Sequence, residues 1–152
     1  MTIDALKLKF KKLHPDAITP TYATPGSGCF DLYSIDDGSL HPVDPHAAIF
    51  RTGLAFEIPE GWIMVIDSRS GHGFKNAIRL SNCSGQIDSD YRGEVCVSLR
   101  YDGNPMYRSI KFRAGERIAQ AKLIPAPRVQ LEEVDALSET QRGAGGFGST
   151  GS

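Results

Sequence analysis

Short stretches of alternating or β-branched apolar residues recur along this chain, and such stretches are typical of strands. The first lies at residues 6–11, where apolar and basic residues alternate as in a half-buried strand. Further strands are expected at 50–58, 62–66, 94–99, 109–112 and 117–124, with an edge strand at 129–131. A helical period is present only briefly, at residues 76–80. The pattern therefore predicts many short strands and almost no helix.

Turn residues separate these stretches. Sixteen glycines and nine prolines are spread along the chain, a density that disfavours long helices. Pro59 and Gly61 lie between two predicted strands, so we expect a hairpin that joins 50–58 to 62–66. The sequence predicts an all-β fold, a jelly-roll-like β-sandwich or barrel with a flexible glycine-rich C-terminal tail.

Length and charge narrow the possible classes of protein. The 152 residues suit one domain, expected at 1–136, followed by a C-terminal arm at 137–152. The net charge of −1 gives no general attraction to nucleic acids or membranes, so we expect neither as a partner. No membrane-spanning run or signal peptide is recognisable, and the three cysteines lack zinc-site spacing. We expect reduced thiols in a cytoplasmic protein, or one in the host-cell cytoplasm if the chain is viral.

Residues 85–93 carry two carboxylates and a phenol in a turn-forming run between glycines. If residues 88–91 form one β-turn, the Cα atoms of Asp88 and Tyr91 lie within about 7 Å of each other. A carboxylate and a flat ring would then flank one small space. This arrangement suits an activated water beside a sugar or a base.

Two segments have the composition of phosphate-binding sites. Arg69, followed by Ser70 and Gly71, has the forked donors, hydroxyl and backbone amide that grip phosphate, although an ordinary polar turn would look similar. We expect His72 and Lys75 nearby to be solvated loop residues.

The second segment is 142–150, which combines glycine amides, Arg142 and the hydroxyls of Ser149 and Thr150. It is not a Walker A loop, because no Gly-Lys-Ser/Thr follows. A disordered tail is the alternative interpretation. Phe147, isolated between glycines, favours a role in stacking on a flat group.

Two polar side chains interrupt otherwise apolar strand sequence. Asp31 lies between Phe30 and Leu32 and should face the opposite side of the strand. Gln120 is expected to share a partly buried face with Ile118, where its amide needs partners. A carboxylate near a metal and a structural hydrogen bond are both compatible with these positions.

Taken in order, the five segments resemble the five motifs of the trimeric dUTPases (deoxyuridine triphosphate nucleotidohydrolases). The resemblance extends over residues 22–151 and is most specific at 85–93 and 142–151. It implies a homotrimer of jelly-roll subunits with sites at the subunit interfaces, each completed by the arm of a neighbouring subunit. It also implies Mg²⁺-dependent hydrolysis of dUTP to dUMP and pyrophosphate by in-line attack of water at the α-phosphorus. That reaction limits uracil in DNA and supplies dUMP for dTMP synthesis.

The resemblance also implies roles for individual residues. Asp88 matches the carboxylate that deprotonates the water, and Gln120 matches a polar group near the α-phosphate. Tyr91 matches the ring beneath the deoxyribose that excludes a 2′-hydroxyl, and Asp31 matches a carboxylate that holds the metal through water. Phe147 matches the aromatic lid over uracil. The remaining residues that match substrate contacts are Arg69, Ser70, Gly71, Asn82, Gly85, Gln86, Ile87, Cys96, Arg142, Gly148, Ser149 and Thr150.

The chain departs from the family pattern at Gly28, Cys29, Phe30, Ser68 and Gln86, but none of these changes removes a group assigned to catalysis. The alternative enzymes are a dCTP deaminase or a bifunctional deaminase–dUTPase of the same fold, and the turn at residues 88–91 favours the dUTPases. A non-catalytic nucleotide- or protein-binding module is the other alternative. The simultaneous presence of an acid and two arginines in the motifs argues against it.

Overall fold

The computed structural model describes residues 6–104 and 110–146. Within them the chain forms eleven strands and one short helix. The elements are β1 (Lys9–Lys12), β2 (Thr21–Tyr22), β3 (Phe30–Tyr33), β4 (Ser39–Leu40), β5 (Ala47–Arg51), β6 (Leu54–Glu57), β7 (Trp62–Asp67), α1 (Ser70–Asn76), β8 (Ile78–Leu80), β9 (Ser84–Ile87), β10 (Cys96–Tyr101) and β11 (Arg117–Pro125). No helix in this part of the chain is long and apolar enough to cross a membrane.

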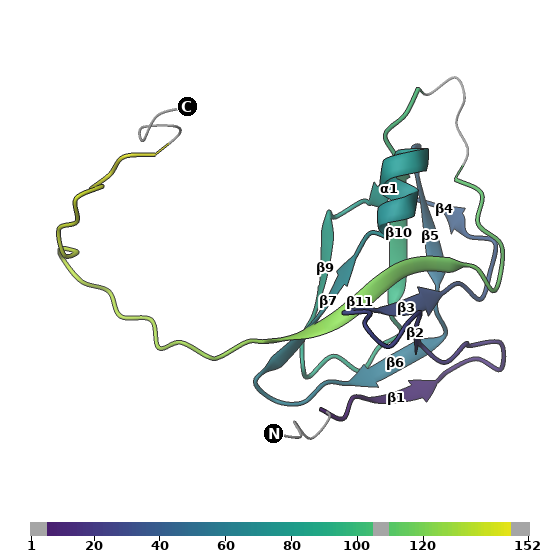
Figure 1. The fold of residues 1–152 in the computed structure, drawn as a ribbon, viewed down its shortest axis with the longest axis horizontal. Coiled ribbons are helices and arrows are strands. Elements are labelled where there is room, and N and C mark those ends of the chain that lie inside the picture. Colours follow the sequence, from purple (N-terminus) through teal and green to yellow (C-terminus); the bar gives the residue numbers. More distant parts are fainter. Residues whose placement is uncertain (1–5, 105–109, 147–152) are drawn as a thin grey trace.

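The strands form three antiparallel sheets (Figure 1). The five-stranded sheet has the order β2-β3-β11-β7-β9, the four-stranded sheet has the order β4-β5-β10-β8, and β1 pairs with β6. Leu32 and Ile118 of the first sheet belong to the same buried cluster as Phe50 and Leu99 of the second. The sheets therefore enclose one shared core, and the predicted all-β class is confirmed.

The predicted hairpin around Pro59 and Gly61 is wrong. β6 pairs with β1, whereas β7 pairs with β9 and β11, so the turn passes between two sheets. The predicted strand at 50–58 is also divided, because Gly53 adopts a positive φ of 65° between β5 and β6. Buried Thr52 holds this break by donating its hydroxyl to the Val95 carbonyl at 2.6 Å. Strand pairing here depends on distant partners, which local turn residues do not reveal.

Other predicted elements lie elsewhere or are not formed. The helix occupies Ser70–Asn76, ahead of the predicted 76–80, and it is capped by Ala77, whose φ is 52°. β1 begins at Lys9 and all four of its side chains are exposed, so it is not half-buried. Residues 110–113 and 126–146 contain no strand, which contradicts the edge strand expected at 129–131 and the strand expected at 109–112 as far as it is described, since residue 109 lies outside the described residues. The strand at 117–124 is confirmed as β11.

Replacing Gly38 by alanine should destabilise the fold by about 2–4 kcal/mol, because a strained backbone and core overpacking add together. Gly38 has a φ of +82°, and an added Cβ would lie 2.5 Å from the ring of fully buried Phe50. Gly61 is the matched control, because its φ of +78° is similar but its Cβ would meet open space. Gly61→Ala should cost only about 1 kcal/mol. Urea unfolding measures both changes, and equal losses would show that contact with Phe50 adds nothing.

Candidate active site

A row of polar side chains crosses the face of the five-stranded sheet that points away from the core. The antiparallel register places Thr21, Asp31, Gln120, Asp67 and Ser84 opposite one another on five successive strands. Directly opposed residues in antiparallel strands share a face. The sheet itself thus brings together residues that are up to 99 positions apart in the chain.

Asp31 is the buried charge in this row, with an exposed fraction of 6%. Its Oδ1 atom accepts a hydrogen bond from Arg69 Nε at 3.1 Å, and its Oδ2 atom accepts one from Arg117 NH1 at 3.3 Å. A carboxylate held by two guanidinium groups is compensated in a place where an unpaired charge would be costly. Asp31 therefore lies fixed between two arginines from different elements.

A β-bulge explains how Arg117 reaches Asp31. The register of β11 against β3 shifts between Arg117 and Ala119. Ile118 at the bulge is fully buried in the core, whereas Gln120 lies in the polar row and is only half-buried. The expectation that Gln120 and Ile118 share one face is therefore wrong, since a bulge interrupts the alternation of the strand.

A cavity of about 320 Å³ lies beside the polar row. Its lining includes Asp31, Arg69, Ser70, Gly71 and Gln120, so three of the predicted segments meet there. Arg69 immediately precedes α1, and Ser70 and Gly71 begin it, in place of a plain turn. Gln120 donates from Nε2 to the Ser68 carbonyl at 3.0 Å, which leaves its amide oxygen as a free acceptor among the described residues. The cavity offers one cation, two serine hydroxyls and amide groups to an anionic ligand, and the charge of the Asp31 carboxylate in its wall is compensated by arginines.

A second cavity, of about 350 Å³, lies beside the turn at residues 88–91. Gln86, Ile87, Asp88, Tyr91 and Cys96 are among the residues that line it. The predicted β-turn is confirmed, because Tyr91 N donates to Asp88 O at 3.2 Å. A carboxylate and an aromatic ring therefore border one space.

In this second cavity the ring of Tyr91 is held in place and the thiol of Cys96 is uncharged. The Tyr91 hydroxyl donates to the Glu94 carbonyl at 3.1 Å, and a Cβ at Gly93 would overlap that hydroxyl. Burial, and after it the Glu94 carboxylate, raise the pKa of the Cys96 thiol above its usual value. Cys96 therefore presents an uncharged surface at neutral pH.

The two cavities are separate in the chain. They share no lining residue. Asp88 comes four positions after Ser84, which pairs with Asp67, so it lies roughly 13 Å along the strand direction from the polar row. One chain therefore does not bring Asp88 together with Gln120 and Arg69 in a single cavity.

Asn82 and Gly85 are not among the residues that line either cavity. Asn82 is exposed in the turn between β8 and β9, and its carbonyl accepts from Ser84 N at 2.7 Å. Gly85 is buried within β9, where an added Cβ would lie 3.2 Å from Ile66 Cβ. Asn82 precedes the strand that leads to Asp88 and Gly85 lies within it, but neither residue lines the cavity that Asp88 borders.

The predicted tail residues are only partly described. Arg142 lies in the segment 126–146, which extends away from the sheets (Figure 1), and its Nε atom donates to Gly145 O at 2.9 Å. Phe147, Gly148, Ser149 and Thr150 lie outside the described residues. Their assignment to the substrate remains a prediction.

Two charged side chains near the polar row, Lys122 and Arg117, were not predicted from the sequence. Lys122 Nζ lies 2.9 Å from Asp67 Oδ2, and the Asp67 carboxylate raises the pKa of Lys122. The period-two spacing from Gln120 to Lys122 is a signal that identifies their common face. No sequence pattern indicates the contact of Arg117 with Asp31, because that contact depends on the bulge.

His72 is a further correction, because it is half-buried on α1 and is not a solvated loop residue. Its ring centroid lies 4.7 Å from that of Phe112. Phe112 is forty positions away in the chain, so the local sequence around His72 did not indicate its burial. Lys75 is exposed as expected, although it lies in the helix.

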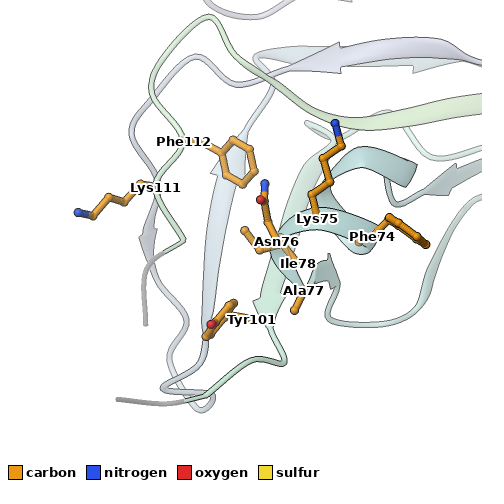
Figure 2. Close-up of a pocket in the computed structure, with 9 residues that line it drawn as sticks. Phe74, Lys75, Asn76, Ala77, Ile78, Tyr101, Lys111 and Phe112 are labelled. Carbon is orange, nitrogen blue, oxygen red and sulfur yellow. The ribbon is translucent and has the colours of Figure 1, made fainter. Parts of the chain in front are cut away.

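A larger cavity of about 450 Å³ lies at the C-terminal end of α1, away from the predicted residues. Figure 2 shows that the amino groups of Lys75 and Lys111, which line it, point in different directions. Two ammonium groups that point in different directions are poorly placed to bind one anion together. Size alone therefore does not make this cavity the active site.

Comparison with known proteins gives a consistent result over nearly the whole chain. The family model described as dUTPase matches residues 16–151. The deoxyuridine 5′-triphosphate nucleotidohydrolase of Nautilia profundicola is 46% identical over 146 residues, which cover 96% of this chain and 99% of that protein. The Wolinella succinogenes protein of the same name is 42% identical and the match covers 96% and 95%.

The fold has solved counterparts. A structure of a mutant Staphylococcus bacteriophage 80alpha dUTPase with dUpNHpp superposes with a TM-score of 0.84 at 25% identity. The superposition covers 97% of this chain and all of that one. The predicted jelly-roll-like fold is thereby confirmed.

Proposed function

Since the chain belongs to the dUTPase family, we propose that it hydrolyses dUTP to dUMP and pyrophosphate with Mg²⁺, in a homotrimer whose sites combine neighbouring subunits. The observation that carries this proposal is the match over residues 16–151, which includes all five predicted segments. The two cavities supply complementary chemistry for such a substrate. One suits phosphate, and the other suits a sugar and a base.

The cavity that contains Arg69 receives the triphosphate. Arg69 uses Nε for Asp31 and NH1 for a contact with His72, and no hydrogen bond to its NH2 is found within residues 6–104 and 110–146. That free end of the guanidinium can form a charge-assisted bond to a phosphate oxygen. Ser70 and Gly71 add a hydroxyl and a backbone amide beside it.

The chemical step requires Asp88 of one subunit to meet Gln120 of another. The Asp88 carboxylate takes a proton from water as the water oxygen bonds to the α-phosphorus. The bond between the α-phosphorus and the bridging oxygen breaks, and the electron pair leaves with pyrophosphate. The amide of Gln120, fixed by Ser68, orients the water and the α-phosphate.

The second cavity accounts for the choice of nucleoside. Tyr91, held by its hydroxyl, places a flat ring against the deoxyribose and leaves no room for a 2′-hydroxyl. Gln86 donates its side-chain amide to Ser84 Oγ at 3.3 Å. β9 is an edge strand, so the backbone groups of Gln86 and Ile87 that do not pair with β7 remain for the donor–acceptor pattern of uracil.

The residues present suit a Mg²⁺ ion that is held mainly by the substrate. Within the described ranges, no three His, Cys, Asp or Glu side chains are grouped closely enough to hold a metal ion. Both oxygens of Asp31 already accept from arginines, so Asp31 suits contact through a water molecule. Bound Mg²⁺ would neutralise phosphate charge and fix the conformation of the triphosphate.

The proposed trimer is supported by the separation of the cavities and by the C-terminal segment. Val129, Leu131 and Leu137 are 74%, 90% and 86% exposed in a segment that extends away from the sheets (Figure 1). Apolar side chains in such a segment favour burial against another subunit. We propose that the arm at 137–152 then carries Arg142 and the glycine-rich end to a neighbouring site in a cytoplasmic enzyme.

Pyrophosphate release from dUTP, dCTP, dTTP and UTP with Mg²⁺ tests the proposed activity. We expect dUTP to exceed the others in kcat/KM by about 10²-fold or more, because the site excludes a 2′-hydroxyl and reads the base by hydrogen bonds. Equal rates for the four nucleotides would contradict the proposed selection. Ammonia release from dCTP would instead favour the deaminase alternative.

A further inference from the structure

Arg69 is held from two sides in the phosphate cavity. Asp31 accepts from its Nε atom at 3.1 Å, and His72 Nε2 lies 3.3 Å from its NH1 atom. His72 lies three positions after Arg69, in the first turn of α1, and its backbone N–H donates to Arg69 O at 3.1 Å. The same short segment therefore supplies both the cation and a second contact to it.

The contact with Arg69 defines the protonation of His72. A guanidinium has only donors, so the contact is a hydrogen bond only if His72 Nε2 is an acceptor. The imidazole must then be neutral, with its hydrogen on Nδ1. Nδ1 is buried and has no hydrogen-bond partner among the described residues. A second proton would have to go to Nε2, where it would face the Arg69 guanidinium and break the hydrogen bond to it.

The surroundings of His72 favour the same neutral form. Burial, and after it the Arg69 guanidinium, lower the pKa of His72 below its usual 6.5. Arg117 acts in the same direction, whereas Glu116 and Asp31 oppose it. The ring also packs on Phe112, so it cannot turn freely away from Arg69.

We propose that His72 is a positioning residue for phosphate binding: its neutral imidazole accepts from Arg69 and, together with Asp31, fixes the guanidinium with NH2 free for the substrate. Protonation of His72 turns this contact into repulsion between two cations and releases Arg69. This inference rests on the proposed function, because it assigns the free end of Arg69 to a phosphate. Phosphate binding by Arg69 would thereby depend on the protonation state of His72.

Two variants separate the acceptor from the packing. His72→Leu removes the acceptor and keeps an apolar side chain against Phe112, whereas His72→Gln supplies another acceptor that does not titrate. His46→Gln is the control, because it removes a half-buried histidine that is not among the residues lining the cavity. Thermal unfolding of each variant establishes that it is folded before binding is compared.

The measurement is the Kd for dUpNHpp with Mg²⁺, determined by calorimetry at about pH 8 and at about pH 5, well below the usual histidine pKa because the pKa of His72 is itself lowered. At the higher pH, His72→Leu should weaken binding about threefold to tenfold, the value of one net hydrogen bond, while His72→Gln stays close to the parent. At the lower pH, the parent should lose more affinity for the ligand than His72→Gln does. Titration of the ligand itself affects both proteins equally, so the difference between them reports protonation of His72. In turnover, the change should fall on KM and leave kcat unchanged.

Three results would overturn the inference. The first is binding by His72→Leu that equals the parent at both pH values. The second is a loss in His72→Gln as large as that in His72→Leu, which would indicate packing alone. The third is failure of the parent protein to bind dUpNHpp, which would contradict the proposed function as well.

Discussion

Replacing Asp88 by asparagine should lower kcat by about 10²–10⁴-fold while nucleotide binding is retained. Asp88 is exposed on the cavity beside Tyr91, so asparagine fits the turn but cannot take the proton of the attacking water. The turn is held by backbone atoms, with Tyr91 N donating to Asp88 O at 3.2 Å. The geometry of the cavity should therefore survive the change.

Single-turnover kinetics with dUTP and the Kd for dUpNHpp separate the chemical step from binding. Asp90→Asn is the matched control, because Asp90 is an exposed carboxylate two positions away that does not line the cavity. It should turn over like the parent. Parent-like turnover in Asp88→Asn would show that another group is the base.

Deleting residues 142–152 should leave a folded protein with kcat/KM reduced on the order of 10²-fold or more, since we propose that these residues position the substrate. Described residues from 126 to 146 contribute no side chain to the buried core. The deleted part includes Arg142, together with Phe147, Ser149 and Thr150 of the predicted lid. Urea unfolding should consequently be unaffected while turnover falls.

Mixing the two inactive proteins tests whether sites are shared. In the proposed trimer, Asp88 and the tail of one site come from different subunits, so a chain without its tail and a chain with Asp88→Asn can complete a site together. Activity should reappear after the two proteins are dissociated and reassembled. Failure to recover activity would indicate that both groups act within one chain, and a fully active truncated protein would show that the tail is not a lid.

The sequence was sufficient for features that are local. The turn from Asp88 to Tyr91 depends on four consecutive residues, and the order of the five segments needs no knowledge of strand pairing. The grouping of Arg69, Ser70 and Gly71 in one segment was likewise evident from the sequence, although the start of a helix there was not. Each of these features is encoded within a few neighbouring positions.

Features that depend on distant contacts were not predictable. The expected hairpin at Pro59 and Gly61 failed because β6 and β7 pair with strands far away in the chain. The burial of His72 depends on Phe112, and the reach of Arg117 to Asp31 depends on a bulge in β11. The separation of Asp88 from the polar row also follows only from the register of β9 against β7.

The division of the polar groups between two cavities links activity to the amount of protein present. If catalysis requires both cavities from different subunits, an isolated chain is inactive and the active fraction follows mass action. Specific activity should then fall on dilution and recover with a high-order dependence on chain concentration. The rate of hydrolysis in the cell would then rise more steeply than the concentration of the protein.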